Sequence, residues 1–459
     1  MFKQKFAPQS EQYSFFTTSI QHTRAAKRKH SPDPLSYPRL RQLLPEANQR
    51  LMIRRNAVAP SIGPKIECSP ARILGRRVLV GKCIGEENQL MSENLIRRRD
   101  VFGAVLAGAA FSATPDLGRS EESSDPKPAP IGNKITLEEH FVFPGAFETT
   151  FRPFGLDPAV WKHIEAKLQD VSQERLPEMD RNGIQMQVVS LNANGIQGES
   201  SRQRAMDHAK AANDWLAEKF VSAHPTRFAG FAAVALQDPA AAADELERAV
   251  RTLGFKGALV NGYTNIGDAE HGEYLDLPKF APFWEQAEAL DVPVYLHPRT
   301  PLPSQRLIYE GHNELLGPMW AFGAETAAHA LRLITSGLFD RYPKLQMILG
   351  HMGEGLVAMM ARAQRRFEYA SCGKHLDKPL GQYLRDHFYI TTSGNFHTPT
   401  LDNVITEVGI DRVMFSVDYP YENMTEGATW FDECPLTGTA RLKVARLNAQ
   451  RLLKLPLEV

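Results

Sequence analysis

Several short apolar segments of this 459-residue chain end in a side chain that can bind a metal ion or carry a proton. These side chains are Glu138, Glu139 and His140 in the first segment, and Asn192, Asn261, His297, His351 and Asp418 in later ones. Residues two apart in a β-strand face the same side, so Glu138 and His140 can share a site while Glu139 faces away. With His297 and Asp418 they would offer two nitrogen and two oxygen ligands, a set that suits Zn(II), Mn(II) or Fe(II).

Each of these residues also has an ordinary structural explanation. A single histidine at a strand end is more often a hydrogen-bonded packing residue than a ligand. Glu138 and Asp418 could equally cap helices or carry solvated charge, and Asn192 and Asn261 could close the turns after their strands. The metal site is favoured because four such groups occupy equivalent strand ends, which packing alone rarely produces.

Glu354 follows His351 by three residues in the string GHMGEG. A carboxylate there can accept a hydrogen bond from one ring nitrogen and so fix the tautomer of the histidine. Alternatively, Glu354 can stabilise the start of a helix through its charge. The two roles are compatible.

Cysteine spacing argues against a thiolate site. Cys68, Cys83, Cys372 and Cys434 are scattered and form no CxxC pair. Neither a disulfide framework nor a cysteine zinc site is indicated, so a bound metal must use histidine and carboxylate ligands.

From Lys134 onward, short apolar segments alternate with amphipathic helical patterns, which is typical of a parallel sheet covered by helices. The predicted strands are 134–140, 186–192, 227–236, 256–262, 292–298, 345–351, 388–394 and 412–418. The predicted helices are 205–223, 239–253, 278–290, 324–340, 354–369, 399–408 and 437–453. Asp238-Pro239 and Thr398-Pro399 each place a capping side chain before a proline.

Eight strands within residues 134–459 predict a single α/β domain, a closed (β/α)8 TIM-type barrel, whose reactive groups stand at the carboxyl ends of the strands. A doubly wound open sheet is the alternative. No GxGxxG string follows the first strand to favour it.

The first 133 residues differ in composition from the rest. Residues 1–90 show no sustained helical or strand period, and we interpret them as disordered or as an upstream extension of the reading frame. Residues 91–113 join Arg97, Arg98 and Arg99 to a weakly apolar run, which resembles a twin-arginine export signal. Residues 114–133 are rich in Pro, Ser and charge and are interpreted as a linker. The protein is therefore expected in the periplasm or outside the cell, and otherwise in the cytoplasm.

Charge and composition exclude several classes of protein. The chain is 43% hydrophobic and 23% charged, as is usual for a globular protein. Residues 1–90 carry 16 Lys+Arg against 6 Asp+Glu, whereas the remainder carries 37 against 47. An acidic main body argues against nucleic-acid binding, and the apolar run of 91–113 is too short for stable membrane insertion.

Six longer strings are spread over the whole predicted barrel: ITLEEHF, GFKGALVNG, FWEQAEALDVPVYLHPRTPLP, LITSGLFDRYPKLQMILGHMGEG, ITTSGNFHTPTL and FSVDYPYEN. Through these strings, the stretch from Lys134 to Leu453 resembles the decarboxylase branch of the amidohydrolase superfamily, and within it the gamma-resorcylate and 2,3-dihydroxybenzoate decarboxylases.

The resemblance implies a role for each candidate residue. Glu138, His140, His297 and Asp418 would bind one divalent metal, Zn2+ or Mn2+, with no organic cofactor. Asp418 would also carry the proton, with His351 and Glu354 beside the substrate and Asn261 and Tyr421 in its pocket. The family has Phe where Tyr421 stands, so the tyrosine bears on substrate identity.

The implied reaction is the non-oxidative decarboxylation of a hydroxylated aromatic carboxylic acid. The resemblance also implies a homodimer or homotetramer. The segment Trp320-Ala321-Phe322 could supply an apolar contact or a lid. One alternative is a hydrolase of lactones or amides, in which the same metal activates water and Asp418 acts as the base. The other is a secreted binding protein that kept the barrel without catalysis.

Overall fold

The structure is a computed structural model that describes residues 130–144, 152–153 and 155–456. The segments 1–90 and 91–113 lie outside the described residues, as does most of the 114–133 linker. The first described strand starts at Lys134.

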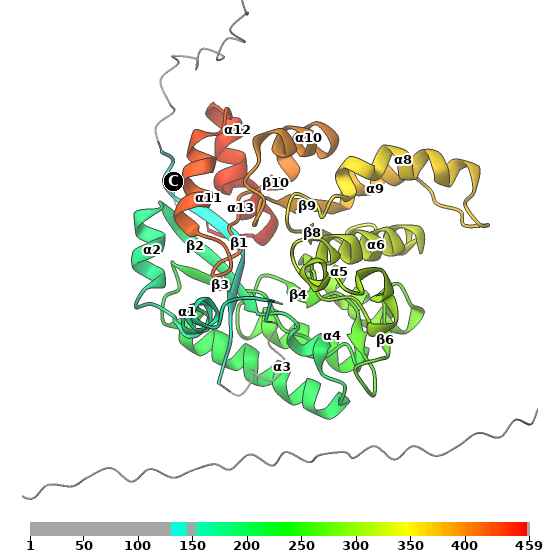
Figure 1. Cartoon of the computed structure of the whole chain (residues 1–459), viewed down its shortest axis with the longest axis horizontal. Coiled ribbons are helices and arrows are strands. Elements are labelled where there is room, and N and C mark those ends of the chain that lie inside the picture. Colours follow the sequence, from blue (N-terminus) through cyan, green and yellow to red (C-terminus); the bar gives the residue numbers. More distant parts are fainter. Residues whose placement is uncertain (1–129, 145–151, 154, 457–459) are drawn as a thin grey trace, which may run out of the picture. The chain divides into compact units, whose positions relative to one another are not determined.

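Eight parallel strands form the centre of the described domain (Figure 1). They are β1 (Lys134–Phe141), β2 (Ile184–Leu191), β3 (Phe228–Gly230), β4 (Ala258–Asn261), β7 (Val294–His297), β8 (Met347–Leu349), β9 (Phe388–Thr391) and β10 (Val413–Met414). The short strands β5 (Thr264–Asn265) and β6 (Gly272–Glu273) form a separate antiparallel pair after β4.

The eight strands close into a ring. The ladder runs β1–β2–β3 in one sheet and β4–β7–β8–β9–β10 in the other. Two parallel bridges join them, Ala232 with Ala258 and Glu139 with Tyr419. This agrees with the predicted barrel and contradicts the doubly wound open sheet, which would leave two free edges.

Strand alternation divides the core into two apolar clusters. In β4, Leu259 belongs to a cluster with Ile135, Val188, Tyr295 and Ile348, one from each of several strands, which fills the ring. Its neighbours Ala258 and Val260 belong to the larger cluster between strands and helices. Because successive side chains point to opposite faces, each strand supplies both clusters. The interior is packed, so a site must lie at a mouth of the barrel.

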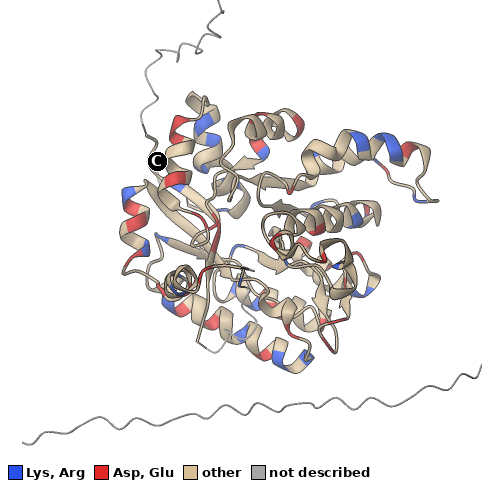
Figure 2. Ribbon diagram, in the orientation of Figure 1, with Lys and Arg blue, Asp and Glu red and all other residues tan. Residues whose placement is uncertain are grey.

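Helices surround the strands (Figure 1). They are α1 (Pro158–Gln169), α2 (Arg175–Arg181), α3 (Arg202–Leu216), α4 (Pro239–Arg251), α5 (Ala281–Leu290), α6 (Ala321–Thr335), α7 (Leu338–Arg341), α8 (Leu356–Tyr369), α9 (Leu380–His387), α10 (Thr398–Val408), α11 (Met424–Glu433), α12 (Gly438–Leu442) and α13 (Asn448–Leu453). Of these, α1, α2, α9 and α11 were not predicted from the sequence. Lys and Arg are interspersed with Asp and Glu along the outer helices (Figure 2).

Some element boundaries differ from the predictions. The predicted strands 345–351 and 412–418 are shorter in the structure, where the ladders end at Leu349 and Met414. His351 and Asp418 lie beyond these ends, with φ of 49° and 79°. Asp238 caps α4 as predicted, accepting hydrogen bonds from two amides of the first turn. The Thr398 cap is wrong, since α10 starts at Thr398 and its hydroxyl accepts from the Trp430 indole. Within the described residues, no helix is long and apolar enough to cross a membrane.

Candidate active site

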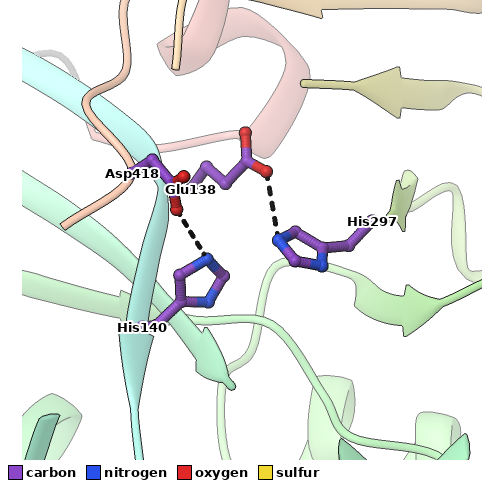
Figure 3. A group of neighbouring side chains, drawn as sticks. All are labelled: Glu138, His140, His297 and Asp418. Atoms are coloured by element: carbon purple, nitrogen blue, oxygen red, sulfur yellow. Dashed lines mark hydrogen bonds and ion pairs between the residues drawn. The ribbon is translucent and has the colours of Figure 1, made fainter. Parts of the chain in front are cut away.

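Four of the predicted site residues meet at the carboxyl ends of the strands (Figure 3). One ligand atom from each of Glu138, His140, His297 and Asp418 lies within 4.8 Å of the others. His140 Nε2 lies 3.1 Å from Asp418 Oδ1, and His297 Nε2 lies 3.3 Å from Glu138 Oε1. Strands β1 and β7 and the turn after β10 therefore bring together the predicted set of two nitrogens and two oxygens.

Glu138 is fully buried and only half satisfied by protein. Its Oε2 accepts hydrogen bonds from the Tyr295 hydroxyl at 2.5 Å and from Ser393. Its Oε1 has no hydrogen-bond partner among the described residues. Burial raises the pKa of this carboxyl group, while the charge of His351 opposes the shift. A buried oxygen without a donor is what a cation ligand requires.

The two histidines are held with one ring nitrogen free for the site. His297 Nδ1 lies 2.9 Å from the Pro298 carbonyl, to which it donates, so Nε2 keeps its lone pair. Burial holds the pKa of His297 well below its ordinary value, which keeps the ring neutral. His140 Nδ1 lies 3.4 Å from the Ser190 hydroxyl, and its Nε2 faces Asp418. The donor set present thus fits a divalent metal.

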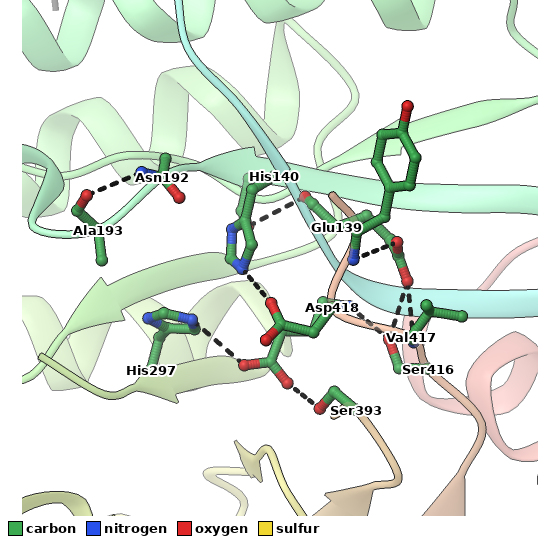
Figure 4. A network of polar contacts seen from close by, with 12 residues as sticks. Glu139, His140, Asn192, Ala193, His297, Ser393, Ser416, Val417 and Asp418 are labelled. Atoms are coloured by element: carbon green, nitrogen blue, oxygen red, sulfur yellow. Dashed lines mark hydrogen bonds and ion pairs between the residues drawn. The ribbon is translucent and has the colours of Figure 1, made fainter. Parts of the chain in front are cut away.

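Glu139 points away from this cluster and positions it from behind (Figure 4). Its carboxylate accepts from the Val417 amide at 3.2 Å, the Tyr419 amide at 3.1 Å and the Ser416 hydroxyl at 3.1 Å. Burial raises its pKa to about 7, against these hydrogen bonds. Because the bonded amides flank Asp418, Glu139 fixes the backbone that presents Asp418.

His351 and Glu354 lie on a strained turn beside the metal ligands. Residues 351–355 all have positive φ, three of them non-glycine, a conformation that costs free energy and is found mostly at functional sites. His351 Nδ1 lies 2.7 Å from Glu354 Oε1, as predicted from their spacing, and Nε2 lies 3.4 Å from Asp418 Oδ2. Burial alone would lower the pKa of His351, but Glu138 and Glu354 raise it well above its ordinary value.

His351 and Asp418 have opposite pKa shifts. Burial would raise the pKa of Asp418, but hydrogen bonds from His140 and His351 lower it below its usual range. The two side chains face each other, with His351 Nε2 3.4 Å from Asp418 Oδ2.

A cavity opens in front of these groups. Its wall includes Asn192, Phe322, Tyr421 and Glu422. Burial raises the pKa of Tyr421, and a hydrogen bond with Asn192 opposes the shift.

Asn261 does not line this cavity. Its side chain lies behind the wall, against Gly195, where an added Cβ would come within 2.6 Å of Asn261 Nδ2. Its assignment as a substrate residue stays a prediction, and the described geometry gives it a supporting place.

Sequence reasoning missed several groups of the site. Tyr295 and Ser393, which hold Glu138, and Glu422 on the cavity wall were not singled out, and Phe322 was named as part of an apolar contact or lid but not as a cavity residue. Tyr295 stands two residues before His297 in its strand, so the alternation that paired Glu138 with His140 could have found it. Phe322 stands at the start of α6, and Glu422 comes from the loop before α11, where no such rule exists.

Comparison with known proteins adds to this geometry. Residues 159–455 match the model of a family described as amidohydrolase. The chain belongs to the amidohydrolase family. It is 48% identical over 325 residues to a gamma-resorcylate decarboxylase from Rhizobium sp. (strain MTP-10005), an alignment that covers 70% of this chain and 98% of the relative.

Solved structures agree. A 2,6-dihydroxybenzoate decarboxylase complexed with 2,6-dihydroxybenzoate is 46% identical with a TM-score of 0.68, covering 71% of this chain and 100% of that one. A dihydroxybenzoic acid decarboxylase from Polaromonas sp. JS666, with bound manganese and the inhibitor 2-nitroresorcinol, is 47% identical with a TM-score of 0.68, covering 71% and 98%. The predicted resemblance to the decarboxylase branch is confirmed, and these neighbours support a TIM-type barrel.

Proposed function

We propose that this amidohydrolase-family member is a metal-dependent carboxy-lyase that removes CO2 from a dihydroxybenzoate and leaves a phenol. The observation that carries the proposal is the cluster of two nitrogen and two oxygen ligands from Glu138, His140, His297 and Asp418 at the wall of the cavity. The substrates named for its relatives are of this chemical class.

Glu138, His140, His297 and Asp418 would hold the divalent metal. When bound, the metal would supply a Lewis acid for the carboxylate and the neighbouring phenolate oxygen of the substrate. We favour Mn2+ because a related structure contains manganese; Zn2+ is the alternative that metal analysis would separate from it.

The residues of the chain would move one proton per turnover. Asp418, having taken a proton from His351 at 3.4 Å, gives it to the ring carbon that bears the carboxylate. The ring electrons form the new C–H bond with help from the phenolate. The carbon–carbon bond then breaks, its electron pair returns to the ring, and CO2 leaves. His351, held by Glu354, regains its proton from solvent.

Tyr421 and Asn192 set the ring pattern in this proposal. They place a phenol and an amide on the cavity wall, where a second ring hydroxyl can be hydrogen-bonded. Substrates with two hydroxyl groups should therefore be preferred to salicylate.

Incubation of metal-loaded protein with 2,6-dihydroxybenzoate, 2,3-dihydroxybenzoate and salicylate tests the proposal through release of CO2 and a phenol. Lactones and amides serve as the parallel panel for a hydrolase. Turnover of the second panel alone would replace the proposal with hydrolysis. Little or no bound metal, together with no turnover of either panel, would indicate a binding protein.

We also propose export through the twin-arginine signal of residues 91–113. Expression from Met91 in a bacterium with that pathway should give a shortened protein outside the inner membrane. Replacing Arg98 and Arg99 with Lys should retain it in the cytoplasm, because the receptor distinguishes guanidinium from ammonium groups. Equal export of the Lys variant would contradict the proposal.

A further inference from the structure

Arg299 is a buried cation that the proposed reaction does not use. It follows His297 by two residues, is 5% exposed, and does not line the cavity. Among the described residues no carboxylate forms an ion pair with Arg299, although Glu325 attracts its charge. A buried arginine of this kind needs several hydrogen bonds to be stable, so its partners show what it holds together.

The guanidinium of Arg299 joins three loops at the carboxyl ends of the strands. Nη1 donates to the Gln197 carbonyl at 3.1 Å and the Tyr263 carbonyl at 2.8 Å, and Nη2 donates to Asn265 Oδ1 at 2.8 Å. The group also lies 4.0 Å from the centre of the Tyr263 ring. Gln197 is in the loop after β2, Tyr263 and Asn265 follow β4, and Arg299 itself follows β7.

A second set of bonds holds Gln197 itself, which lies in the same loop as two residues of the cavity wall. Gln197 is 1% exposed. Its side-chain oxygen accepts a hydrogen bond from the backbone N–H of Asn261 at 3.1 Å, and its side-chain nitrogen donates to the Val234 carbonyl at 2.9 Å. The cavity residues Asn192 and Ala193 lie at the start of the same loop as Gln197. Pro298, also on the wall, is the residue before Arg299.

We propose that Arg299 is a positioning residue that fixes the substrate-facing wall of the cavity by clamping the loops after β2, β4 and β7. The inference rests on the proposed function for its kinetic consequence only. A planar fork that donates in several directions is required, because a lysine ammonium is a point charge and cannot reproduce that geometry. The Arg299 side chain also lies close against the backbone of the loop after β4. A Cβ on Gly262, whose φ is +60°, would lie 2.7 Å from Arg299 Cγ.

The clamp predicts a division between substrate binding and chemistry. The hydrogen bonds of Arg299 go to Gln197, Tyr263 and Asn265 and to none of the four metal ligands, so Arg299→Lys and Arg299→Met should both keep wild-type metal content. Loosening the wall weakens contacts made in both the ground state and the transition state, so KM for 2,6-dihydroxybenzoate should rise about ten-fold while kcat changes little.

Hydrogen–deuterium exchange on the metal-loaded full chain provides the readout that does not depend on activity. In both variants, amides of 192–200 and 262–268 should exchange faster than in wild type, while those of β1 and β8 stay unchanged. Arg332→Met is the matched control, because Arg332 also pairs with polar groups and lies over a tyrosine ring, but outside the cavity. Its KM and the exchange of 192–200 should stay at wild-type values.

Gln197→Leu gives an independent route, since it breaks the link to Asn261 and leaves the carbonyl that Arg299 contacts. It should raise KM and speed exchange in 192–200. Wild-type KM and exchange in the Arg299 variants, or exchange that rises equally across all strands, would overturn the proposal. If wild-type protein does not decarboxylate but the two loops lose protection as expected, the clamp stands and the proposed function fails.

Discussion

At the scale of single residues, the site works by leaving selected atoms without protein partners. Tyr295 and Ser393 bond one oxygen of Glu138, and the other faces the ligand cluster without a donor. Pro298 and Ser190 occupy the Nδ1 atoms of His297 and His140, so both Nε2 atoms face inward. The protein orients each ligand through groups that never touch the metal.

We expect His297→Ala and Asp418→Ala each to abolish decarboxylation, with metal content falling most in His297→Ala. Removing one ligand of four leaves a site of lower affinity, and Asp418 is in addition the proton carrier of the proposed reaction. Elemental analysis and CO2 release measure the two effects. His329→Gln, a change of a buried histidine outside the site, is the control. Wild-type metal content and rate in either alanine variant would remove that residue from the site.

At the scale of elements, α6 contains a histidine that couples its packing to pH. His329 is fully buried, and its Nε2 accepts a hydrogen bond from the Leu275 amide at 3.1 Å. Burial, together with the charge of Arg332, lowers the pKa of His329 to about 3. The folded protein therefore holds this ring neutral, whereas the unfolded chain protonates it below its ordinary pKa of 6.5.

This pair of pKa values fixes the sign of a stability effect. The unfolded state binds the extra proton at His329. The contribution of this residue to stability is therefore fully present above about pH 6.5 and is lost as the pH falls toward 3. Between pH 7 and pH 5, wild type should lose about 2 kcal/mol more unfolding free energy than His329→Gln, whose amide can still accept from Leu275. Urea unfolding at both pH values measures the difference. Equal losses in the two proteins would show that His329 is not responsible.

The N-terminus of α4 allows a second test at this scale. Asp238 accepts from the Ala240 and Ala241 amides, both at 3.2 Å, and pairs with Arg202. Asp238→Ala should reduce the free energy of unfolding by about 1 kcal/mol, whereas Asp238→Asn should retain most of it, because the amide oxygen still caps the helix. Thermal or urea unfolding of the two variants compares them. If Asp238→Asn lost as much unfolding free energy as Asp238→Ala, the effect would come from the ion pair with Arg202 and not from the helix cap.

At the scale of the whole molecule, the barrel begins with a buried ion pair between Lys134 and Asp432. Lys134 is 1% exposed, and its Nζ lies 2.9 Å from Asp432 Oδ2 and 3.0 Å from the Asn182 carbonyl. A chain that starts at Gly132 keeps this ion pair, so we expect it to fold and turn over substrate like the full chain. A chain that starts at Leu137 loses Lys134 and the buried Ile135, and should be insoluble. Insolubility of the Gly132 chain would show that the preceding residues belong to the fold.

Assembly is the second prediction at this scale. Phe322 lines the cavity, whereas Met319 and Trp320 just before it are 69% and 63% exposed. We expect light scattering to give a homodimer or homotetramer, and Trp320→Glu to shift it toward the monomer because a charge replaces apolar contact area. A monomeric wild type would contradict this expectation.

The sequence alone determined the type of site and most of the strands that carry it. Glu138, His140 and His297 were located by strand ends and alternation, because a period of two residues and the rule that barrel sites lie at the carboxyl ends are local properties. The helices α1, α2, α9 and α11 escaped because their apolar stripes are short or mixed with polar residues.

Only the tertiary structure decided how these residues work together. His351 and Asp418 leave their strands through left-handed turns, which side-chain pattern does not encode. The bonds that hold Glu138, the support of Asp418 by Glu139, and the Arg299 contacts join residues between 34 and 280 positions apart. Such contacts depend on ring closure, which places chemically ordinary residues within hydrogen-bonding distance, and no local signal in the sequence records that distance.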